Sequence, residues 1–374
     1  MNRFVTIQLV CLLALGAAAS GCASGPCDSE KFPSVSGTTL FVAASCGSDS
    51  GTGAANAPFA TIGKAAAAAT SGTTIAVAAG TYKEALVLGN GVGLVGTGSK
   101  NVIVQPPAGA SGLSCTGTGA IVLQGFRVDK AAQLGISVTG GDVTFEDVEV
   151  SGTTRGKTGV LPIGGHGVQV TDAKTATMRN INVHDNEGTG VLAVHVMNVS
   201  IVDPIFIVDP IFSPQGADSK VGIVDPIFTP SVSIAGNWGG GVAIVDPIFA
   251  PDPGKGDGNT AVAPSFRIGS ANLSANKGFG IALFGATGSI ERTVVSGTIK
   301  LDSDVADGIV IAGGTAKPTR DLAVNITANC VIADNARSGL LTASKNDDAF
   351  ATKTTLNGQI ARNALGGAGP RRAV

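Results

Sequence analysis

Acidic and basic residues that could act on a sugar polymer gather in the middle of the chain. Four carboxylates lie close together, at Asp142, Glu146, Asp147 and Glu149, and cations follow at Arg155, Lys157 and Arg179. A calcium-dependent polysaccharide lyase needs carboxylates that hold the cation and an Arg or Lys near the proton that is removed. Asp147 and Arg179 are therefore catalytic candidates, although a solvated charged face is the favoured interpretation of the same residues.

A second acidic group is a candidate calcium site. It consists of Asp302, Asp304 and Asp307. The residues between these carboxylates match no known calcium-loop motif, and no Cys-x-x-Cys or His-rich spacing suggests another metal. We therefore expect no resident cofactor, with calcium needed only if the protein is a lyase.

Aromatic side chains suited to stacking on sugars are scarce. The chain contains one Trp and one Tyr. Trp238 lies in a predicted corner, so it is a candidate ligand-binding residue. Tyr82 lies near the start of the predicted fold and is expected to be structural.

A phrase of the form Asn-x-x-x-Gly, followed by an apolar run, recurs in the second half of the chain. The pairs are Asn186–Gly190, Asn237–Gly241, Asn276–Gly280 and Asn335–Gly339. Asn and Gly tolerate the left-handed backbone of a sharp corner between short strands. Val168 and Val191 are 23 residues apart, which suits one coil of three strands. The pattern predicts a parallel β-helix of about a dozen coils over residues 37–365, in preference to a β-sandwich or a propeller.

The N-terminal region contains further segments that point to the same fold. In order, they are Phe41–Asp49, Ala57–Ile62, Ala65–Ala69 and Gly80-Thr81-Tyr82. This series resembles the opening module of right-handed parallel β-helix proteins in the pectin-lyase-like superfamily. The resemblance implies an all-β, single-stranded right-handed parallel β-helix (a solenoid), with a first strand at Leu40–Ala43 and a short N-terminal capping helix at Ile62–Thr70. It implies no single activity, because the superfamily includes lyases, hydrolases, epimerases and adhesins.

Gly165-His166-Gly167 matches a short motif of polygalacturonases, which resemble this fold class. The resemblance implies a catalytic role for His166. The sequence lacks the carboxylates that those enzymes carry before the His, and it lacks their later Arg-Ile-Lys. The favoured interpretation is a corner glycine before a strand at Val168–Val170.

Residues 1–21 have the character of an export signal. Arg3 supplies a positive charge, and the run Phe4–Ala18 is apolar but too short to span a membrane comfortably. Ala19-Ser20-Gly21-Cys22 resembles the bacterial lipobox, which implies lipidation of Cys22 and anchoring in the lipid bilayer. The alternative is an ordinary signal peptide cut near this point. The resemblance implies an exported cell-envelope protein, at the outer membrane or the cell surface, with a linker at 22–36.

Four further cysteines remain after Cys11 and Cys22 are set aside: Cys27, Cys46, Cys115 and Cys330. An exported protein can form disulfides, and four thiols allow three connectivities. Cys27 with Cys46 is the preferred pair, because both lie in the N-terminal cap region.

The hexapeptide Ile-Val-Asp-Pro-Ile-Phe occurs four times, starting at Ile201, Ile207, Ile223 and Ile244. Its irregular spacing excludes a stacked structural repeat. Ile-Val would extend a strand and Asp-Pro would end it, because Pro cannot donate to the ladder. We therefore predict loop insertions at 201–230 and 246–264. They are either copied sequence tolerated in surface loops, the favoured interpretation, or an apolar patch for a partner or a membrane.

Overall composition narrows the classes of function that the protein could have. The net charge is −2 and only 14% of the 374 residues are charged, so no basic footprint for nucleic acid exists. The leading hypothesis is a monomeric, non-enzymatic surface or adhesion protein that binds polysaccharide or another envelope component. The alternative is a polysaccharide lyase or glycoside hydrolase, which would need three or more convergent carboxylates, or carboxylates with an Arg. Residues 366–374 are predicted to be a disordered tail.

Overall fold

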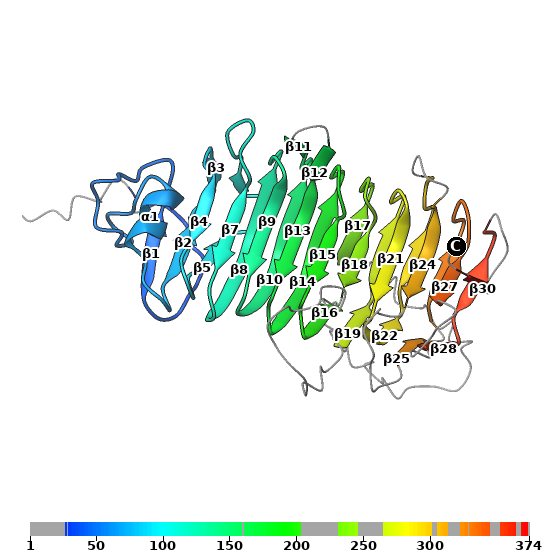
Figure 1. Cartoon of the computed structure of the whole chain (residues 1–374). Coiled ribbons are helices and arrows are strands. Elements are labelled where there is room, and N and C mark those ends of the chain that lie inside the picture. Colours follow the sequence, from blue (N-terminus) through cyan, green and yellow to red (C-terminus); the bar gives the residue numbers. More distant parts are fainter. Residues whose placement is uncertain are drawn as a thin grey trace, which may run out of the picture.

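The chain forms a rod of short parallel strands, with one helix at the N-terminal end of the described residues (Figure 1). The computed structural model describes residues 27, 29–158, 161–202, 231–245, 265–300, 305–312, 322–327, 329–344, 352–363 and 368–372. Each coil adds strands to two long parallel sheets, one of 18 strands and one of 10. The predicted β-helix is confirmed.

The 18-stranded sheet is folded into two strips. The first strip contains β1 (Thr39–Val42), β2 (Thr74–Val77), β5 (Gly93–Gly96), β16 (Asn198–Val202), β19 (Ser265–Gly269), β22 (Thr287–Glu291), β25 (Leu322–Ile326) and β28 (Thr352–Leu356). The second strip contains β3 (Gly80–Tyr82), β6 (Val102–Val104), β17 (Val232–Ala235), β20 (Ala271–Ser274), β23 (Val294–Ser296), β26 (Val331–Ala333) and β29 (Gln359–Ala361). Three longer strands cross both strips: β8 (Ala120–Asp129), β10 (Asp142–Ser151) and β14 (Thr175–His184).

The 10-stranded sheet closes each coil. Its members are β4 (Leu86–Leu88), β7 (Leu113–Thr116), β9 (Leu134–Thr139), β13 (His166–Thr171), β15 (Val191–Val194), β18 (Val242–Val245), β21 (Phe279–Phe284), β24 (Asp307–Ala312), β27 (Leu340–Ser344) and β30 (Ala368–Arg372). An antiparallel hairpin, β11 (Arg155–Thr158) with β12 (Leu161–Gly164), precedes β13. Because β30 pairs with β27, the sheet extends into the segment 366–374 where the sequence predicted a disordered tail.

The core consists of columns in which equivalent residues of successive coils stack on one another. One column contains Leu123, Phe145, Met178, Ile201, Ile268 and Ile290, all buried. Alternate residues of each strand point inward, as the period of two in a strand requires. Burial of such side chains stabilises the fold by about 1.5–3 kcal/mol each.

The corner between the second strip and the 10-stranded sheet contains buried asparagines that bond to one another. The Asn186 backbone N–H and side-chain Nδ2 both donate to Asn237 Oδ1, at 3.2 and 2.9 Å. In the same way, the Asn237 backbone N–H and Nδ2 both donate to Asn276 Oδ1, at 3.1 and 3.0 Å. Asn335 does the same toward Asn363 Oδ1, at 3.0 and 2.9 Å. The four asparagines of the recurrent phrase, which include Asn186 and Asn335, are 0–1% exposed, so this asparagine ladder satisfies polar groups inside the rod.

The left-handed backbone at this corner lies one residue earlier than the sequence predicted. Positive φ angles occur at Asp185 (55°), Gly236 (65°), Ala275 (53°) and Asp334 (55°), each directly before its asparagine. The glycine of the phrase has a different role. A Cβ on Gly190 would lie 2.7 Å from Asn237 Nδ2, and one on Gly241 would lie 2.4 Å from the Gly280 carbonyl oxygen. Close packing between coils, and not corner geometry, therefore requires Asn and Gly in the phrase.

The bend between the two strips is a single left-handed residue in most coils. Asp147, Asn180 and Ser270 occupy it with φ of 51°, 48° and 54°. Strand β14 pairs with β16 on one side of its bend and with β17 on the other. The chain between β16 and β17 is therefore inserted at this bend.

The first and fourth hexapeptide copies begin as strands. Ile201-Val202 ends β16, and Ile244-Val245 ends β18. Ile201 and Ile244 are both buried, so the predicted insertion at 201–230 begins two residues too early. Strand β18 ends at Val245, and the predicted insertion at 246–264 lies outside the described residues. The remaining hexapeptide residues lie outside the described residues.

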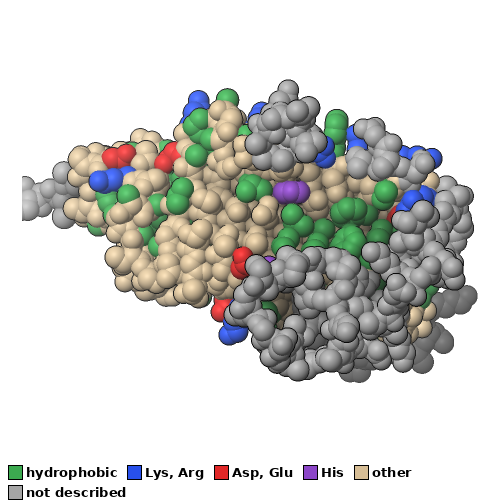
Figure 2. Space-filling view, viewed as in Figure 1, with side chains coloured by type: hydrophobic (Ala, Val, Ile, Leu, Met, Phe, Trp, Pro, Cys, Tyr) green, Lys and Arg blue, Asp and Glu red, His purple; other side chains and the backbone are tan. Residues whose placement is uncertain are grey.

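The outer face of the 10-stranded sheet changes character along the rod. One outward row starts with Ser114, Ser137 and Gln169 and continues with Leu192, Ala243, Ala282, Val310 and Leu341. Figure 2 shows the corresponding change from a largely polar surface to hydrophobic side chains over β18, β21 and β24. The change begins at β15, the strand that comes directly before β16 and the first insertion.

The N-terminal cap is held by α1 (Ile62–Ala68), which buries Ile62 and Ala65. The Glu84 carboxylate accepts from the Ile62 and Gly63 backbone N–H groups at 3.0 and 2.7 Å, which satisfies the first turn. The helix ends two residues before the predicted Thr70, because Ala69 is already extended.

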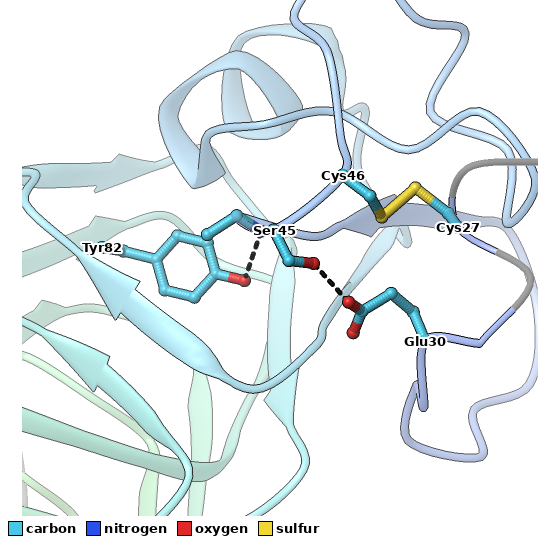
Figure 3. Close-up of a disulfide and its surroundings, with 6 residues drawn as sticks. Cys27, Glu30, Ser45, Cys46 and Tyr82 are labelled. Carbon is cyan, nitrogen blue, oxygen red and sulfur yellow. Dashed lines mark hydrogen bonds between the residues drawn. A yellow bond between two sulfur atoms is a disulfide. The ribbon is translucent and has the colours of Figure 1, made fainter.

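The residues predicted as a linker are tied to the cap. Cys27 and Cys46 form a disulfide, the pair preferred from the sequence (Figure 3). The Phe32 ring contacts Phe41 edge to face, with centroids 4.9 Å apart. Tyr82 is buried and its hydroxyl donates to the Ala78 carbonyl at 2.9 Å; burial raises the pKa of Tyr82 to about 12. Tyr82 is therefore a structural residue of the cap, as predicted.

Replacing a ladder asparagine tests the corner. In Asn237→Ala, the Asn186 donors lose their acceptor inside the rod, and a buried unsatisfied group costs about 1–3 kcal/mol. We expect the free energy of unfolding in urea to fall by about 3 kcal/mol. Asn272→Ala, which changes a partly exposed residue of β20, is the control and should cost less than about 0.5 kcal/mol. Equal effects of the two substitutions would contradict a stabilising ladder.

Deletions of the tandem hexapeptides test which of their residues belong to the core. Removing Ile207–Phe212 leaves Ile201 in place, so the melting temperature should hardly change. Removing Ile201–Phe212 brings Ser213 to the buried position of Ile201, and loss of such a side chain costs about 2–5 kcal/mol. Thermal melting followed by circular dichroism should therefore separate the two deletions, and indistinguishable melting would show that Ile201 does not support the core.

Candidate ligand-binding surface

A row of polar side chains follows the outer face of the first strip. Its members, one from each successive coil, are Thr144, Thr177, Ser200, Arg267, Ser289 and Asn325. All are partly or fully exposed. Parallel strands lie about 4.8 Å apart, so the row presents hydrogen-bonding groups at regular intervals along the rod. We call it the polar row.

Both hexapeptide-bearing segments adjoin a strand of this row in the sequence. The segment 203–230 follows β16, and the segment 246–264 precedes β19. Strands β16 and β19 are hydrogen-bonded neighbours, with Ser200 paired to Arg267. The first insertion therefore begins at the C-terminal end of β16, and the second ends at the N-terminal end of its neighbour β19.

Glu291 and Glu149 are each held by a neighbouring group. Glu291 accepts hydrogen bonds from Arg267 and Ser289, both at 2.9 Å. The bond from Arg267 is the main cause that lowers the pKa of Glu291. On the second strip, Glu149 Oε1 lies 3.5 Å from Arg127 and 3.6 Å from His184. These carboxylates act as surface pairs between adjacent coils.

Asp147 has a structural role at the bend. Its carboxylate accepts from the Ser99 backbone N–H at 3.0 Å and from the Ser99 hydroxyl at 2.9 Å. Asn180 Nδ2 donates to it at 3.2 Å from the next coil. These bonds fix a left-handed bend residue and occupy three of the about four lone-pair sites of the carboxylate.

His166 lies away from the other two catalytic candidates. It starts β13 in the 10-stranded sheet, whereas Asp147 and Arg179 belong to the 18-stranded sheet. Its Nδ1 accepts from the Thr189 backbone N–H at 3.1 Å. Burial and then the charge of Arg155 lower the pKa of His166, so the ring favours its neutral form. Arg179 is exposed beside Glu146 in the sheet register.

Close packing explains the glycine at position 167, directly after this histidine. A Cβ there would lie 2.5 Å from Val183 Cγ1 and 2.8 Å from Asn186 Nδ2. Gly167 thus belongs to the same close-packed glycines as Gly190. Coil packing therefore explains Gly167, whereas the favoured interpretation from the sequence was a corner glycine before the strand.

Asp307, one of the three predicted calcium ligands, is buried and already paired. Arg337 Nε donates to its Oδ1 at 2.8 Å, Arg337 Nη2 contacts Oδ2, and the Ser338 backbone N–H donates at 3.1 Å. The other two, Asp302 and Asp304, lie outside the described residues. Among the residues that the structure describes, no group of three or more His, Cys, Asp or Glu is placed to hold a metal.

Trp238 is the large aromatic residue exposed beside the asparagine ladder. Its side chain is 49% exposed. The Lys277 ammonium lies 3.5 Å from the indole centroid, a cation–π contact between neighbouring coils. Sequence reasoning found Trp238 but missed Lys277, because the two residues are 39 positions apart and only the coil register brings them together.

The two remaining described cysteines are buried and free. They are Cys115 and Cys330. Burial raises the pKa of Cys115 to about 12, which keeps it as an unreactive thiol. In the same described part of the chain, no helix is long and apolar enough to cross a membrane.

Comparison with known proteins supports the fold. A family model described as "Right handed beta helix region" matches residues 111–205, from β7 to the end of β16. The ladders of this region continue in both directions along the rod. The molecule is therefore a right-handed parallel β-helix. A search of curated proteins found no significant match.

Several solved structures are similar to this chain. A pectate lyase Pel9A has a TM-score of 0.49 and 14% identity, covering 88% of this chain and 80% of its own. The mannuronan C-5 epimerase AlgE6 A-module of Azotobacter vinelandii has a TM-score of 0.37 and 14% identity, covering 83% and 92%. A polygalacturonase from Erwinia carotovora ssp. carotovora has a TM-score of 0.31 and 11% identity, covering 91% and 99%. Identities this low concern the fold alone and say nothing about activity.

Proposed function

We propose that this protein is a non-enzymatic, envelope-anchored β-helix that binds polysaccharide along the polar row. The observation that carries the proposal is the regular presentation of hydroxyl, amide and guanidinium groups by successive coils. A linear glycan is itself a repeat of hydroxyl-bearing units. A solenoid offers it an extended surface with one contact per coil.

The state of the nearby carboxylates favours binding over catalysis. Asp147 accepts three hydrogen bonds at the bend, and Glu291 is engaged by Arg267 and Ser289. A general base needs a free lone pair within reach of the proton that it removes. The alternative, a polysaccharide lyase or glycoside hydrolase, is favoured by one observation: the Arg267–Glu291 pair belongs to the same face as the polar row.

Polysaccharide binding is tested with full-length protein and a panel of neutral and acidic glycans. We expect retardation in affinity electrophoresis with at least one glycan. Thr177→Ala combined with Ser289→Ala should raise its Kd about five- to 150-fold, because each of the two lost hydrogen bonds costs about 0.5–1.5 kcal/mol. Thr139→Ala, on the exposed face of the 10-stranded sheet, is the matched control and should leave Kd unchanged.

Mixtures of the protein with the same glycans also test whether the protein is an enzyme. They are incubated with and without calcium and assayed for reducing ends and unsaturated products. Release of either product would establish an enzyme and overturn the non-enzymatic proposal. Failure to bind any glycan would overturn polysaccharide binding.

Envelope anchoring is supported by the lipobox-like sequence at Ala19–Cys22. Lipid chains on Cys22 would hold the protein on a bilayer by burying their methylene groups, about 0.8 kcal/mol each. We therefore expect Cys22→Ser to move the protein from the membrane pellet to the soluble fraction. Cys115→Ser, which changes a buried thiol, is the control. Sedimentation of Cys22→Ser with membranes at high salt would contradict the lipid anchor.

A further inference from the structure

The asparagine corner carries an exposed ridge on its outer side. In each coil the residue after the ladder position stacks on its equivalent in the next coil. Trp238 N–H donates to the Asn186 carbonyl at 2.8 Å, and Lys277 N–H donates to the Asn237 carbonyl at 2.8 Å. The next position, Ile299, is 46% exposed, close to the 49% of Trp238. We call Trp238, Lys277, Ile299 and the adjoining Lys300 the corner ridge.

The corner ridge is cationic although the whole chain is slightly acidic. Lys300 is exposed, and the Lys277 ammonium lies over the indole face with no carboxylate partner in the described part of the chain. Arg155 adds a positive charge one coil before Glu187, strongly enough to help lower the pKa of His166. Figure 2 shows Lys and Arg side chains along the upper edge of the rod.

The acidic groups at this corner are already engaged. The Glu187 carboxylate accepts from the Arg155 backbone N–H at 2.7 Å. Asp334 is paired with Arg362, and Asp307 is buried against Arg337. Among the described residues no carboxylate is paired with Lys277 or Lys300, so these cations can interact with an anionic ligand.

We propose that the corner ridge is a second glycan site, which takes an acidic polysaccharide across Trp238 and Lys277. The Lys277 ammonium would bind a carboxylate of the polymer, and the exposed indole would stack on the apolar face of the adjacent sugar. Lys300 would contact the next acidic unit along the rod. The inference takes its class of polymer from the proposed function but concerns a corner separate from the polar row.

The cation–π pair makes the site observable. At an exposed site this contact is weak, so a carboxylate can compete with the ring for the ammonium. Because the chain contains a single Trp, tryptophan fluorescence reports only on Trp238. Ligand binding at the corner ridge should therefore change the emission directly.

The test is a fluorescence titration of the full-length chain with polygalacturonate, with neutral dextran in parallel. We expect a saturable change in emission with polygalacturonate alone, weakened as salt screens the charges. Lys277→Gln should raise Kd about two- to fivefold, the range for an exposed ion pair of 0.2–1 kcal/mol. Lys174→Gln, an exposed lysine at a different corner, should leave Kd unchanged.

Retention on immobilised polygalacturonate is measured alongside, because it does not depend on Trp238. Retention without an emission change would overturn the corner ridge while leaving polysaccharide binding intact. Loss of retention on every glycan would instead overturn the proposed function. An equal response to single-stranded oligothymidylate would show a general polyanion site and overturn the choice of an acidic polysaccharide. Urea unfolding of Lys277→Gln confirms that the variant is folded before its Kd is interpreted.

Discussion

The hydrogen bonds between buried asparagines are the interaction that holds the corner in the second half of the rod. Asn237 accepts two bonds from Asn186 in the coil before it and donates two to Asn276 in the coil after it. Such a buried amide is tolerable only when its partners stay in place, since each unsatisfied group costs about 1–3 kcal/mol. Gly241 completes the constraint, because any side chain there would collide with the next coil. Together these residues set the register between coils.

A fixed register turns sequence positions far apart into regular surfaces. Because equivalent residues stack, one outward residue per coil becomes a continuous row, such as Thr177, Ser200 and Arg267 on the first strip. The same register places Lys277 over Trp238 across the asparagine corner. The polar row and the corner ridge therefore both arise because equivalent residues of successive coils stack on one another. Each needs only suitable residues at outward positions, because the buried ladder supplies the spacing.

The sequence predicted the fold well because the coil is periodic. The Asn-x-x-x-Gly phrase located the corners, yet the reason was wrong: Asp185 and Gly236 adopt the left-handed backbone, while Asn186 and Asn237 bond inside the rod. The candidate site was less predictable, since its contacts join distant residues. Nothing near Asp307 in the sequence indicated that Arg337 would neutralise it. Nor did the sequence show that the helix would end at Ala68, before the predicted Thr70.

The hexapeptides illustrate how a solenoid can accept extra chain without losing its core. A β-helix position needs an apolar residue that faces inward, and Ile201 and Ile244 meet that need in two different sheets. The hexapeptide thus begins with residues that any coil can use. The first insertion then leaves at a bend where other coils need only one left-handed residue, such as Asn180. Closing a longer loop there costs little, since the entropy grows only with the logarithm of its length. Stacking constrains the inward residues, whereas the corners leave the chain free to lengthen.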